Sequence, residues 1–421
     1  MRMQKMDQLM CRARRLADSP VMAIAGLLVI VAALASCAQP GAIIRPALPE
    51  PVKAAPAAEK PAVEPVIVGK LLEPGTGDNL APSVSIAAVA PASTPTPRQA
   101  NIALIIPLNS KNFAQVAEAV KQGFTAGAQV EGANAPPIRI YASDDEGNSL
   151  AAQYRKAVQE GAVALVGGIT RDGANVLAKE AGLLPTLALN APTEAELPDR
   201  FFYISLNVDG EARQLARAAA QEGFRRAAVL VGNTPLAKRI QESFEREWAR
   251  LGGQIAVRVT LSSEPNAYAQ LHTTIERASA DMAFFAAGSG AARGARPYLP
   301  TGLPVFATSH SLDARAEPVQ NVDLESVRFL EMPWFVEKDH PAVMAYAKPA
   351  SSLPLDYERL YALGIDAWRL TQIILKTDRA RDIAPLDGVT GKLTLDGAQF
   401  VRTLTSVEMR DGVPYVFRPG E

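Results

Sequence analysis

The chain has 421 residues, and its 43 Lys and Arg residues nearly balance 44 Asp and Glu residues, for a net charge of −1. That length suits roughly two or three domains with real cores, and the near-zero charge gives no electrostatic reason to expect a nucleic-acid partner. Two Cys and three His exclude a disulfide scaffold and argue against a zinc site of the Cys/His kind.

The first 36 residues have the pattern of a secretory signal peptide. A basic segment precedes an uncharged run from Val21 to Ala35, which is shorter than the roughly 20 apolar residues of a membrane-spanning helix. Leu34-Ala35-Ser36-Cys37 resembles the lipobox of bacterial lipoproteins, so we expect lipidation of Cys37; an uncleaved membrane anchor is the alternative. Ala38, where retained lipoproteins carry Asp, favours the outer membrane and a lipid-anchored protein that faces the periplasm.

Residues 37–98 form a segment rich in Pro and Ala between the signal and the folded part. The first aromatic residue after Cys37 is Phe113. A segment of this composition cannot bury enough apolar surface to offset the entropy of ordering, which predicts a disordered tether. Extended as polyproline II, it reaches on the order of 190 Å, which would let an outer-membrane protein work deep in the periplasm.

From Asn101 onward, apolar β-branched runs alternate with helical patterns. Such runs indicate strands that are buried on both faces of parallel sheets. One helix is marked at both ends, because Thr234 can cap it, Pro235 suits its first turn and Gly252-Gly253 ends it. The expected strands are Ile102–Leu108, Ile138–Ala142, Val163–Gly167, Pro185–Asn190, Phe202–Leu206, Ala228–Gly232, Ile255–Leu261, Met282–Ala287, Val305–Thr308 and Val327–Trp334.

Two such series of about a hundred residues each are followed by about 110 residues, too few for a third series. The pattern predicts an α/β fold over residues 99–421, a bilobal type I periplasmic-binding-protein-like fold with two parallel-sheet βα lobes. We expect the lobes to be completed by returning segments, as about 99–207 plus 326–385 for lobe 1 and about 208–325 plus 386–421 for lobe 2. Asp411-Gly412, a strong type I′ turn signal, predicts a closing hairpin.

The sequence offers little catalytic chemistry. Gly288–Gly294 follows a strand, but its third Gly comes one residue late for a dinucleotide loop and no acidic residue follows at the required distance. Ser143–Glu146 lacks the alternating acids of a calcium loop. Nucleophile-elbow, zinc-protease and Walker motifs are absent from the sequence. We therefore expect no enzyme activity, no cofactor and no metal.

Five stretches carry a family resemblance, and the most specific is Glu358–Trp368, with Tyr361, Gly364, Asp366 and Trp368. The other four are Leu187–Pro192, Glu211–Arg213, Arg239–Gly253 and Asp387–Leu393. Together they resemble the C-terminal domain of the LpoA/LppC family, outer-membrane lipoproteins that activate a class A penicillin-binding protein. The resemblance implies a non-enzymatic regulator of peptidoglycan synthesis. It departs from the best-known members in that a tether stands where they carry a helical-repeat domain.

The motif residues have a structural interpretation as well. Gly364 allows close approach of a neighbouring element, and we expect Tyr361, Asp366 and Trp368 to fix packing between the lobes more than to contact a partner. The sequence does not locate the surface that docks on the synthase. Tyr415 and Arg410 of the closing hairpin are candidate anchors, because such residues often contribute most to interface energy.

The same fold serves solute receptors of ABC importers for amino acids or small amides, which is the alternative function. Hydroxyls and a hinge acid around such a ligand would come from Thr170, Asn190, Asn207, Asp209 and Ser289. For Thr170, capping of the following helix is the favoured explanation. Asn190-Ala191-Pro192 stands where amino-acid receptors usually carry hydroxyl residues that hold a carboxylate, so the sequence favours the activator.

Overall fold

The computed structural model describes residues 100–145, 147–182, 184–194, 196–262, 268–312 and 316–418. The expected signal peptide, the lipidation site Cys37 and the expected tether lie outside these residues. None of the helices in the described ranges combines the length and the apolar character that crossing a membrane requires.

Lobe 1 is built on an eight-stranded sheet in the order β11-β12-β13-β5-β4-β3-β1-β2. Its first five strands in sequence are parallel to their neighbours, and the C-terminal strands β11, β12 and β13 pair with one another in antiparallel fashion. The strands are β1 (Asn101–Ile106), β2 (Ile138–Ala142), β3 (Ala162–Gly167), β4 (Thr186–Ala188), β5 (Phe201–Ile204), β11 (Leu386–Gly388), β12 (Gly391–Asp396) and β13 (Gln399–Thr403).

Helices cover both faces of this sheet. Because successive residues of a strand point to opposite faces, Ile102, Leu104 and Ile106 of β1 pack in one core with α3 and α13, and Ala103 and Ile105 pack in another with α4 and α5. The continuous apolar run of β1 is thereby explained. The helices are α3 (Ala114–Glu131), α4 (Asn148–Gln159), α5 (Arg171–Glu180) and α13 (Leu355–Lys376), with short 3₁₀ turns η1 (Gly132–Asn134) and η5 (Ala380–Asp382).

Lobe 2 repeats the design on a seven-stranded sheet in the order β15-β14-β10-β9-β8-β6-β7. The pairs β10–β14 and β14–β15 are antiparallel, and the other pairs are parallel. The strands are β6 (Arg226–Val231), β7 (Gln254–Thr260), β8 (Met282–Ala286), β9 (Val305–Ala307), β10 (Val327–Glu331), β14 (Thr405–Arg410) and β15 (Val413–Val416).

The long helices α6 (Val208–Gln221) and α7 (Pro235–Arg250) cover one face of this sheet, with Phe244 and Trp248 fully buried. The ends predicted for α7 are confirmed: the Thr234 hydroxyl accepts a hydrogen bond from the Ala237 N–H at 3.0 Å, and Gly252, with a φ of 81°, follows the last turn. The remaining helical segments are α8 (Leu271–Arg277), α9 (Ser289–Ala295), η2 (Arg296–Tyr298), η3 (Ser309–Ser311), α10 (Pro318–Asn321), η4 (Val322–Leu324), α11 (Pro333–Val336) and α12 (Pro341–Met344).

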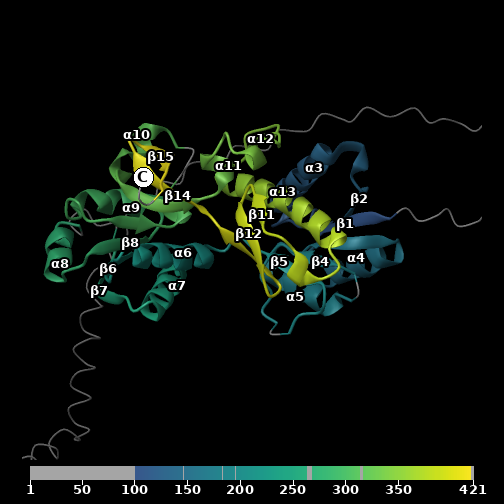
Figure 1. The fold of residues 1–421 in the computed structure, drawn as a ribbon, viewed down its shortest axis with the longest axis horizontal. Helices are drawn as coiled ribbons and strands as arrows, with labels where there is room; N and C mark the ends of the chain where they lie inside the picture. The colour runs from purple at the N-terminus through teal and green to yellow at the C-terminus, as the bar shows by residue number, and fades with distance from the viewer. Residues whose placement is uncertain are drawn as a thin grey trace, which may run out of the picture. The chain divides into compact units, whose positions relative to one another are not determined.

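The chain passes between the two sheets three times, at 205–207, 332–354 and Leu404. Figure 1 shows the consequence: the yellow C-terminal strands are divided between the blue lobe 1 and the green lobe 2. The hairpin predicted around Asp411-Gly412 is confirmed, with positive φ angles of 51° and 74° at its two turn residues.

The division of the C-terminal third differs from the expected one. Val327–Glu331 pairs with β9 and belongs to lobe 2, whereas β11 to β13 pair next to β5 and belong to lobe 1. The expected strand Val327–Trp334 also ends early, because Pro333 opens the short helix α11. These assignments depend on which distant strands pair with each other. The local pattern of apolar residues does not show that pairing.

Candidate functional site

The family-motif stretch lies on α13, which packs directly against α3. A Cβ atom at Gly364 would overlap the main-chain carbonyl of Val120, and one at Gly123 would overlap the carbonyl of Tyr361. The close approach expected at Gly364 is therefore present, and it depends on a glycine in each helix. This contact fixes α13 on lobe 1 and is structural.

Two motif aromatics pack in different places. Trp368 meets Phe124 edge to face, with ring centroids 5.3 Å apart, inside lobe 1. The ring of Tyr361 instead packs against that of Trp334, with centroids 5.7 Å apart, and the Tyr361 hydroxyl donates a hydrogen bond to the Ala347 carbonyl at 2.8 Å. Tyr361 therefore contacts the segment that crosses between the lobes, while the ring of Trp368 packs in the core of lobe 1.

Asp366 organises a turn of lobe 1. Its carboxylate is fully buried and accepts hydrogen bonds from the Val389 N–H at 3.0 Å, the Thr390 N–H at 2.8 Å and the Thr390 hydroxyl at 2.7 Å. Burial raises the pKa of Asp366, and the bonds from Thr390 oppose that rise. Asp366 thus holds the Gly388–Gly391 turn. It thereby joins two of the family stretches, Glu358–Trp368 and Asp387–Leu393.

Three of the expected ligand-facing residues are engaged by the fold itself. The Thr170 hydroxyl accepts from the Gly173 N–H at 3.0 Å and caps α5, and Asn207 caps α6 by accepting from the Gly210 N–H at 2.9 Å. Asn190 donates to the Ile169 carbonyl at 3.0 Å and accepts from the Ala191 N–H at 2.8 Å. Their capping and loop-closing roles account for these polar groups without a ligand.

The other two expected residues lie in lobe 2. Asp209 forms an ion pair with Arg239, with Oδ1 and Nε 3.0 Å apart. Ser289 opens α9 and lines a cavity of about 570 Å³ at the ends of β6, β8 and β9, together with Thr234, His310 and Arg359. Burial lowers the pKa of His310. Thr170 and Asn190 are not among the residues that line this cavity, so the structure does not bring the five candidates together.

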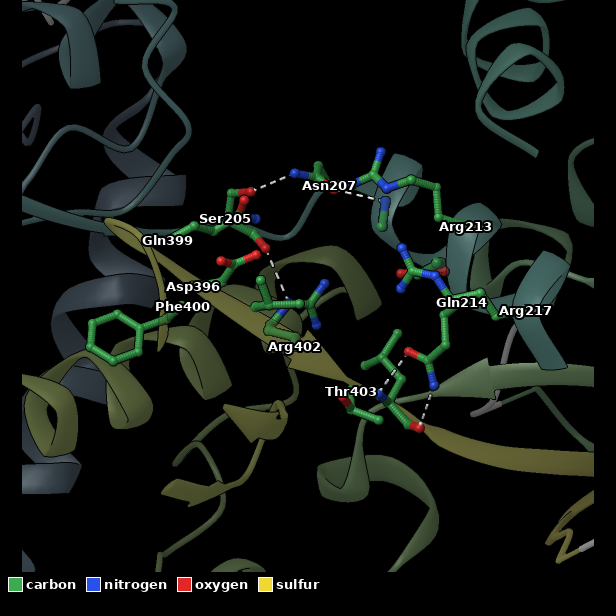
Figure 2. A pocket seen from close by; sticks show the side chains of 14 residues that line it. Ser205, Asn207, Arg213, Gln214, Arg217, Asp396, Gln399, Phe400, Arg402 and Thr403 are labelled. Atoms are coloured by element: carbon green, nitrogen blue, oxygen red, sulfur yellow. Dashed lines mark hydrogen bonds between the residues drawn. The ribbon is translucent and has the colours of Figure 1, made fainter. Parts of the chain in front are cut away.

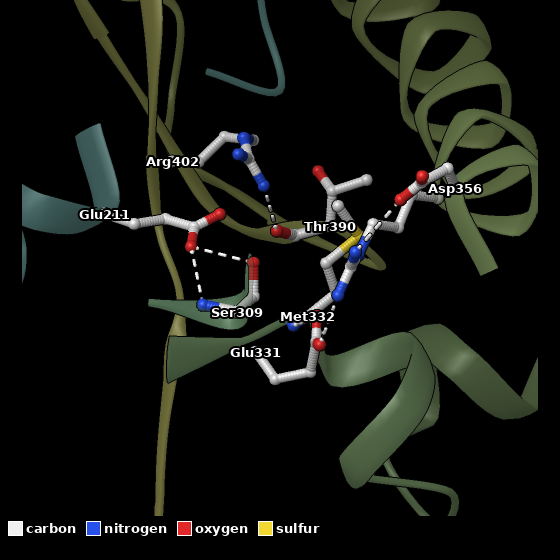
Figure 3. A network of polar contacts seen from close by, with 8 residues as sticks. Glu211, Ser309, Glu331, Met332, Asp356, Thr390 and Arg402 are labelled. Atoms are coloured by element: carbon white, nitrogen blue, oxygen red, sulfur yellow. Dashed lines mark hydrogen bonds and ion pairs between the residues drawn. The ribbon is translucent and has the colours of Figure 1, made fainter. Parts of the chain in front are cut away.

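A buried polar network lies beside the three crossing segments (Figure 3). We call Glu211, Ser309, Glu331, Arg359 and Arg402 the crossover network. The Glu211 carboxylate accepts from the Ser309 N–H and hydroxyl at 3.1 and 2.8 Å. Arg359 donates to Glu331 at 2.8 Å, and Arg402 donates to the Thr390 carbonyl at 3.2 Å. Because α13 and β13 belong to lobe 1 and the other members to lobe 2, the network ties the lobes at their crossings.

Burial dominates the electrostatics of this network. It raises the pKa of Glu211, and the nearby Arg402 opposes the rise. Burial likewise lowers the pKa of Arg402, against the attraction of Glu211 and Glu331. Charges of both signs are therefore held together in a desolvated place, where removing one partner would leave the other uncompensated.

A second cavity, of about 250 Å³, lies between α6 and β13; we call it the crossover pocket. Figure 2 shows Ser205, Asp396 and Gln399 on one side, Arg213, Gln214 and Arg217 on the other, and Arg402 between them. The Gln214 amide donates to the Leu404 carbonyl at 3.0 Å and accepts from the Leu404 N–H at 3.1 Å. These two hydrogen bonds join α6 of lobe 2 to Leu404, where the chain crosses between the lobes for the third time.

The sequence alone did not predict the charged residues of the crossover network and the crossover pocket as site residues. Glu211 and Arg213 appear in the sequence only as part of a family stretch, and Arg402 and Glu331 stand at the ends of apolar strands. An arginine or a glutamate inside a strand that is otherwise apolar is the one signal available, because such a charge needs a buried partner. The partner itself comes from a distant segment.

A sequence model of the family described as "LppC putative lipoprotein" matches residues 94–275 and 261–412. A curated relative, penicillin-binding protein activator LpoA of Pantoea ananatis, is 26% identical over 329 residues, which cover 67% of this chain and 48% of that protein. The chain spans about half the length of the first curated relatives it matches.

Two solved structures share the fold over about three quarters of the chain. One, from Chromobacterium violaceum, is described as a "putative branched-chain amino acid ABC transporter"; it is 34% identical, with a TM-score of 0.65, and 74% of this chain and all of that chain are covered. The other is the LpoA C-domain of Haemophilus influenzae, described as a regulator of PBP1A; it is 20% identical, with a TM-score of 0.62 and coverage of 76% and 100%. The expected bilobal fold is thus confirmed.

Proposed function

We propose, because the chain belongs to the LppC putative lipoprotein family, that its folded part docks on a class A penicillin-binding protein and raises the activity of that peptidoglycan synthase. The match of the family model across nearly all of the folded part carries this proposal. The curated relatives are described as penicillin-binding protein activators. Activation by docking requires no reacting group, so the protein acts as a regulator and does no chemistry of its own.

The physical basis of such activation is differential binding. A regulator shifts its partner toward an active conformation only as far as it binds that conformation more tightly than the resting one. Lipidation of Cys37 would place the protein at the outer membrane, and the segment 37–98 would carry the folded part toward the synthase. The family description as a lipoprotein supports this anchor.

The β14–β15 hairpin is the docking surface in this proposal. Tyr415 is 50% exposed on the edge strand β15, and the Arg410 side chain is 55% exposed beside Glu408. Aromatic and arginine side chains that become buried on binding contribute the most to interface energy. Tyr298 of η2 has a similar exposure, 45%, and provides a matched surface control.

The test is to add the mature protein to its cognate synthase with lipid-linked precursor. We expect a saturable increase in glycan polymerisation or peptide cross-linking, which Tyr415→Ala weakens and Tyr298→Ala leaves unchanged. Neither binding nor a rate change, with the protein demonstrably folded, would refute the proposal. Equal loss in both variants would remove the hairpin as the docking surface.

A solute receptor for an ABC importer is the second candidate. The 34% identity to the Chromobacterium structure favours it, and the cavity beside Ser289 offers a place for a ligand. A receptor would bind an amino acid at micromolar concentration, with a rise in melting temperature that Ser289→Ala reduces, since a ligand of the native state alone stabilises it by RT ln(1 + [L]/Kd). We expect no such rise, because Thr170, Asn190 and Asn207 are engaged by the fold.

A further inference from the structure

We propose that the crossover pocket binds a small anion, a molecule with a carboxylate or phosphate group, through the guanidinium groups of Arg213 and Arg402. The pocket offers about 250 Å³, several times the roughly 30 Å³ that one water occupies in the liquid. It therefore admits inorganic phosphate or a small organic acid.

This pocket is separate from the cavity in which a solute receptor would hold its ligand. That cavity is lined by Ser289, His310 and the end of β6, and the crossover pocket shares none of its lining residues. Thr170 and Asn190 line neither of the two. Binding in the crossover pocket is consequently a property beyond the proposed function, and either one can fail without the other.

All three guanidinium groups in the pocket keep nitrogens that make no hydrogen bond within the described residues, but of the three only Arg217 forms an ion pair there with a carboxylate. Arg402 donates a hydrogen bond from Nε to the Ser205 carbonyl at 3.0 Å and another from Nη1 to the Thr390 carbonyl at 3.2 Å. Its Nη2 makes no hydrogen bond within the described residues. Arg213 is half-buried and makes no hydrogen bond or ion pair in that same part of the chain. Arg217 differs, because its Nε lies 2.7 Å from Glu247 Oε1.

Glu211 attracts Arg402 electrostatically, but within the described residues no carboxylate forms an ion pair with Arg213 or Arg402. Glu211 directs its carboxylate to Ser309, which is not a lining residue, and burial raises the pKa of Glu211. Asp396 is exposed on the other side of the pocket, next to Gln399 (Figure 2). An anion held by Arg213 and Arg402 would thus be favoured by charge-assisted hydrogen bonds, and Asp396 would repel it unless the ligand also carries a hydroxyl or amino donor.

The position of the pocket gives binding a structural consequence. Ser205 and Arg402 belong to the lobe 1 side, Arg213 and Gln214 to α6 of lobe 2, and the first and third crossings form part of the wall. A ligand that bridges these walls binds best to one arrangement of the lobes and stabilises that arrangement. Hydrogen exchange in α6 and β13 should slow when the anion binds.

The experiment titrates the full mature chain with inorganic phosphate and, separately, with succinate, at constant ionic strength set with sodium chloride. Calorimetry and the melting temperature report binding. We expect saturable binding that chloride does not reproduce, and an affinity at least tenfold lower in Arg213→Gln. Asp396→Asn should raise the affinity about threefold, because it removes the opposing charge, and Arg217→Gln should change it less than twofold, because Glu247 already engages Arg217.

The outcomes separate the sources of the anion. Binding of phosphate alone assigns the site to phosphate-bearing molecules, binding of succinate alone assigns it to carboxylates, and binding of both supports the shared chemistry. Absence of saturable binding by either probe overturns the proposal. So does binding that Arg213→Gln and Arg217→Gln weaken equally, since a diffuse positive surface would give that result.

Discussion

Each lobe covers one face of its sheet with a pair of long helices, and the two pairs are packed by different means. In lobe 1, α3 and α13 meet backbone to backbone at Gly123 and Gly364. In lobe 2, α7 packs through large side chains instead: Phe244 stacks on Trp248 of the same helix and on Phe284 of β8, with ring centroids 5.5 and 3.9 Å apart. A contact between backbones has no side chain that can move aside, so it should tolerate substitution least.

Each pair of helices also carries buried acidic residues, and two of these, Asp366 and Glu247, are bound by different kinds of donor. Asp366 on α13 is fully buried and bound by main-chain and hydroxyl donors, with Arg369 3.4 Å away, whereas the buried Glu247 on α7 is bound by the half-exposed Arg217 and the exposed Arg250. Lobe 1 therefore depends on fixed geometry and lobe 2 on side chains with freedom to adjust. Substitutions in these helices test that difference.

The largest effect is expected from Gly123→Ala, whose Cβ would overlap the Tyr361 carbonyl. Closely packed helices cannot separate without opening the core beneath them, so we expect a loss of about 5 kcal/mol or failure of lobe 1 to fold. Chemical denaturation measures it. Gly290→Ala in α9 is the control, because nothing lies within 4 Å of its added Cβ, and it should change stability by less than about 1 kcal/mol.

Trp248→Ala should cost somewhat less, about 4 kcal/mol, through lost burial and the cavity that it leaves. Its ring is fully buried, and its Nε1 donates to the Gln254 carbonyl at 3.1 Å. Trp248→Phe should recover at least half of the loss, because an aromatic stack on Phe244 remains possible. A Gly123→Ala variant milder than Trp248→Ala would contradict the ranking of the two lobes.

Asp366→Asn is expected to destabilise the protein by about 2 to 3 kcal/mol. The amide keeps one acceptor oxygen, but its NH₂ group would face the N–H of Val389 or Thr390, and a buried donor would lose its acceptor. Melting curves at low and high salt should show the same loss. A loss that salt abolishes would indicate a surface ion pair instead of this buried turn.

Glu247 gives the smallest effect and a pH dependence. Hydrogen bonds from Arg250 and from Arg217 lower the pKa of Glu247 to about 2, although burial acts to raise it. A carboxylate with a lowered pKa stabilises the fold above the unfolded value near 4.5 and loses that contribution as the pH falls toward 2. Because the arginines are 48% and 64% exposed, screening limits the gain to about 1 to 2 kcal/mol.

The measurement for Glu247 compares the wild type with Glu247→Gln from pH 7 to pH 2. We expect the variant to be less stable at pH 7 and the difference to shrink below about pH 4.5. Added salt should also reduce it, in contrast to Asp366→Asn. A difference that is independent of both pH and salt would show that Glu247 acts through packing alone.

Much of the local structure is determined by the sequence alone. Thr234, Pro235 and Gly252 set the ends of α7 because capping and backbone freedom act within a few residues, and Asp411-Gly412 sets the hairpin turn for the same reason. Continuous apolar runs such as that of β1 identify strands buried on both faces, and with them the α/β fold.

The tertiary structure decided which distant segments meet. No local pattern shows that β10 pairs in lobe 2 while β11 to β13 pair beside β5, because strand pairing depends on partners far along the chain. The same holds for Glu211, which meets Ser309, and for Arg402, which meets the carbonyls of Ser205 and Thr390. Capping geometry is local and can be read from neighbours, whereas a buried charge is satisfied only by the partners that folding brings to it.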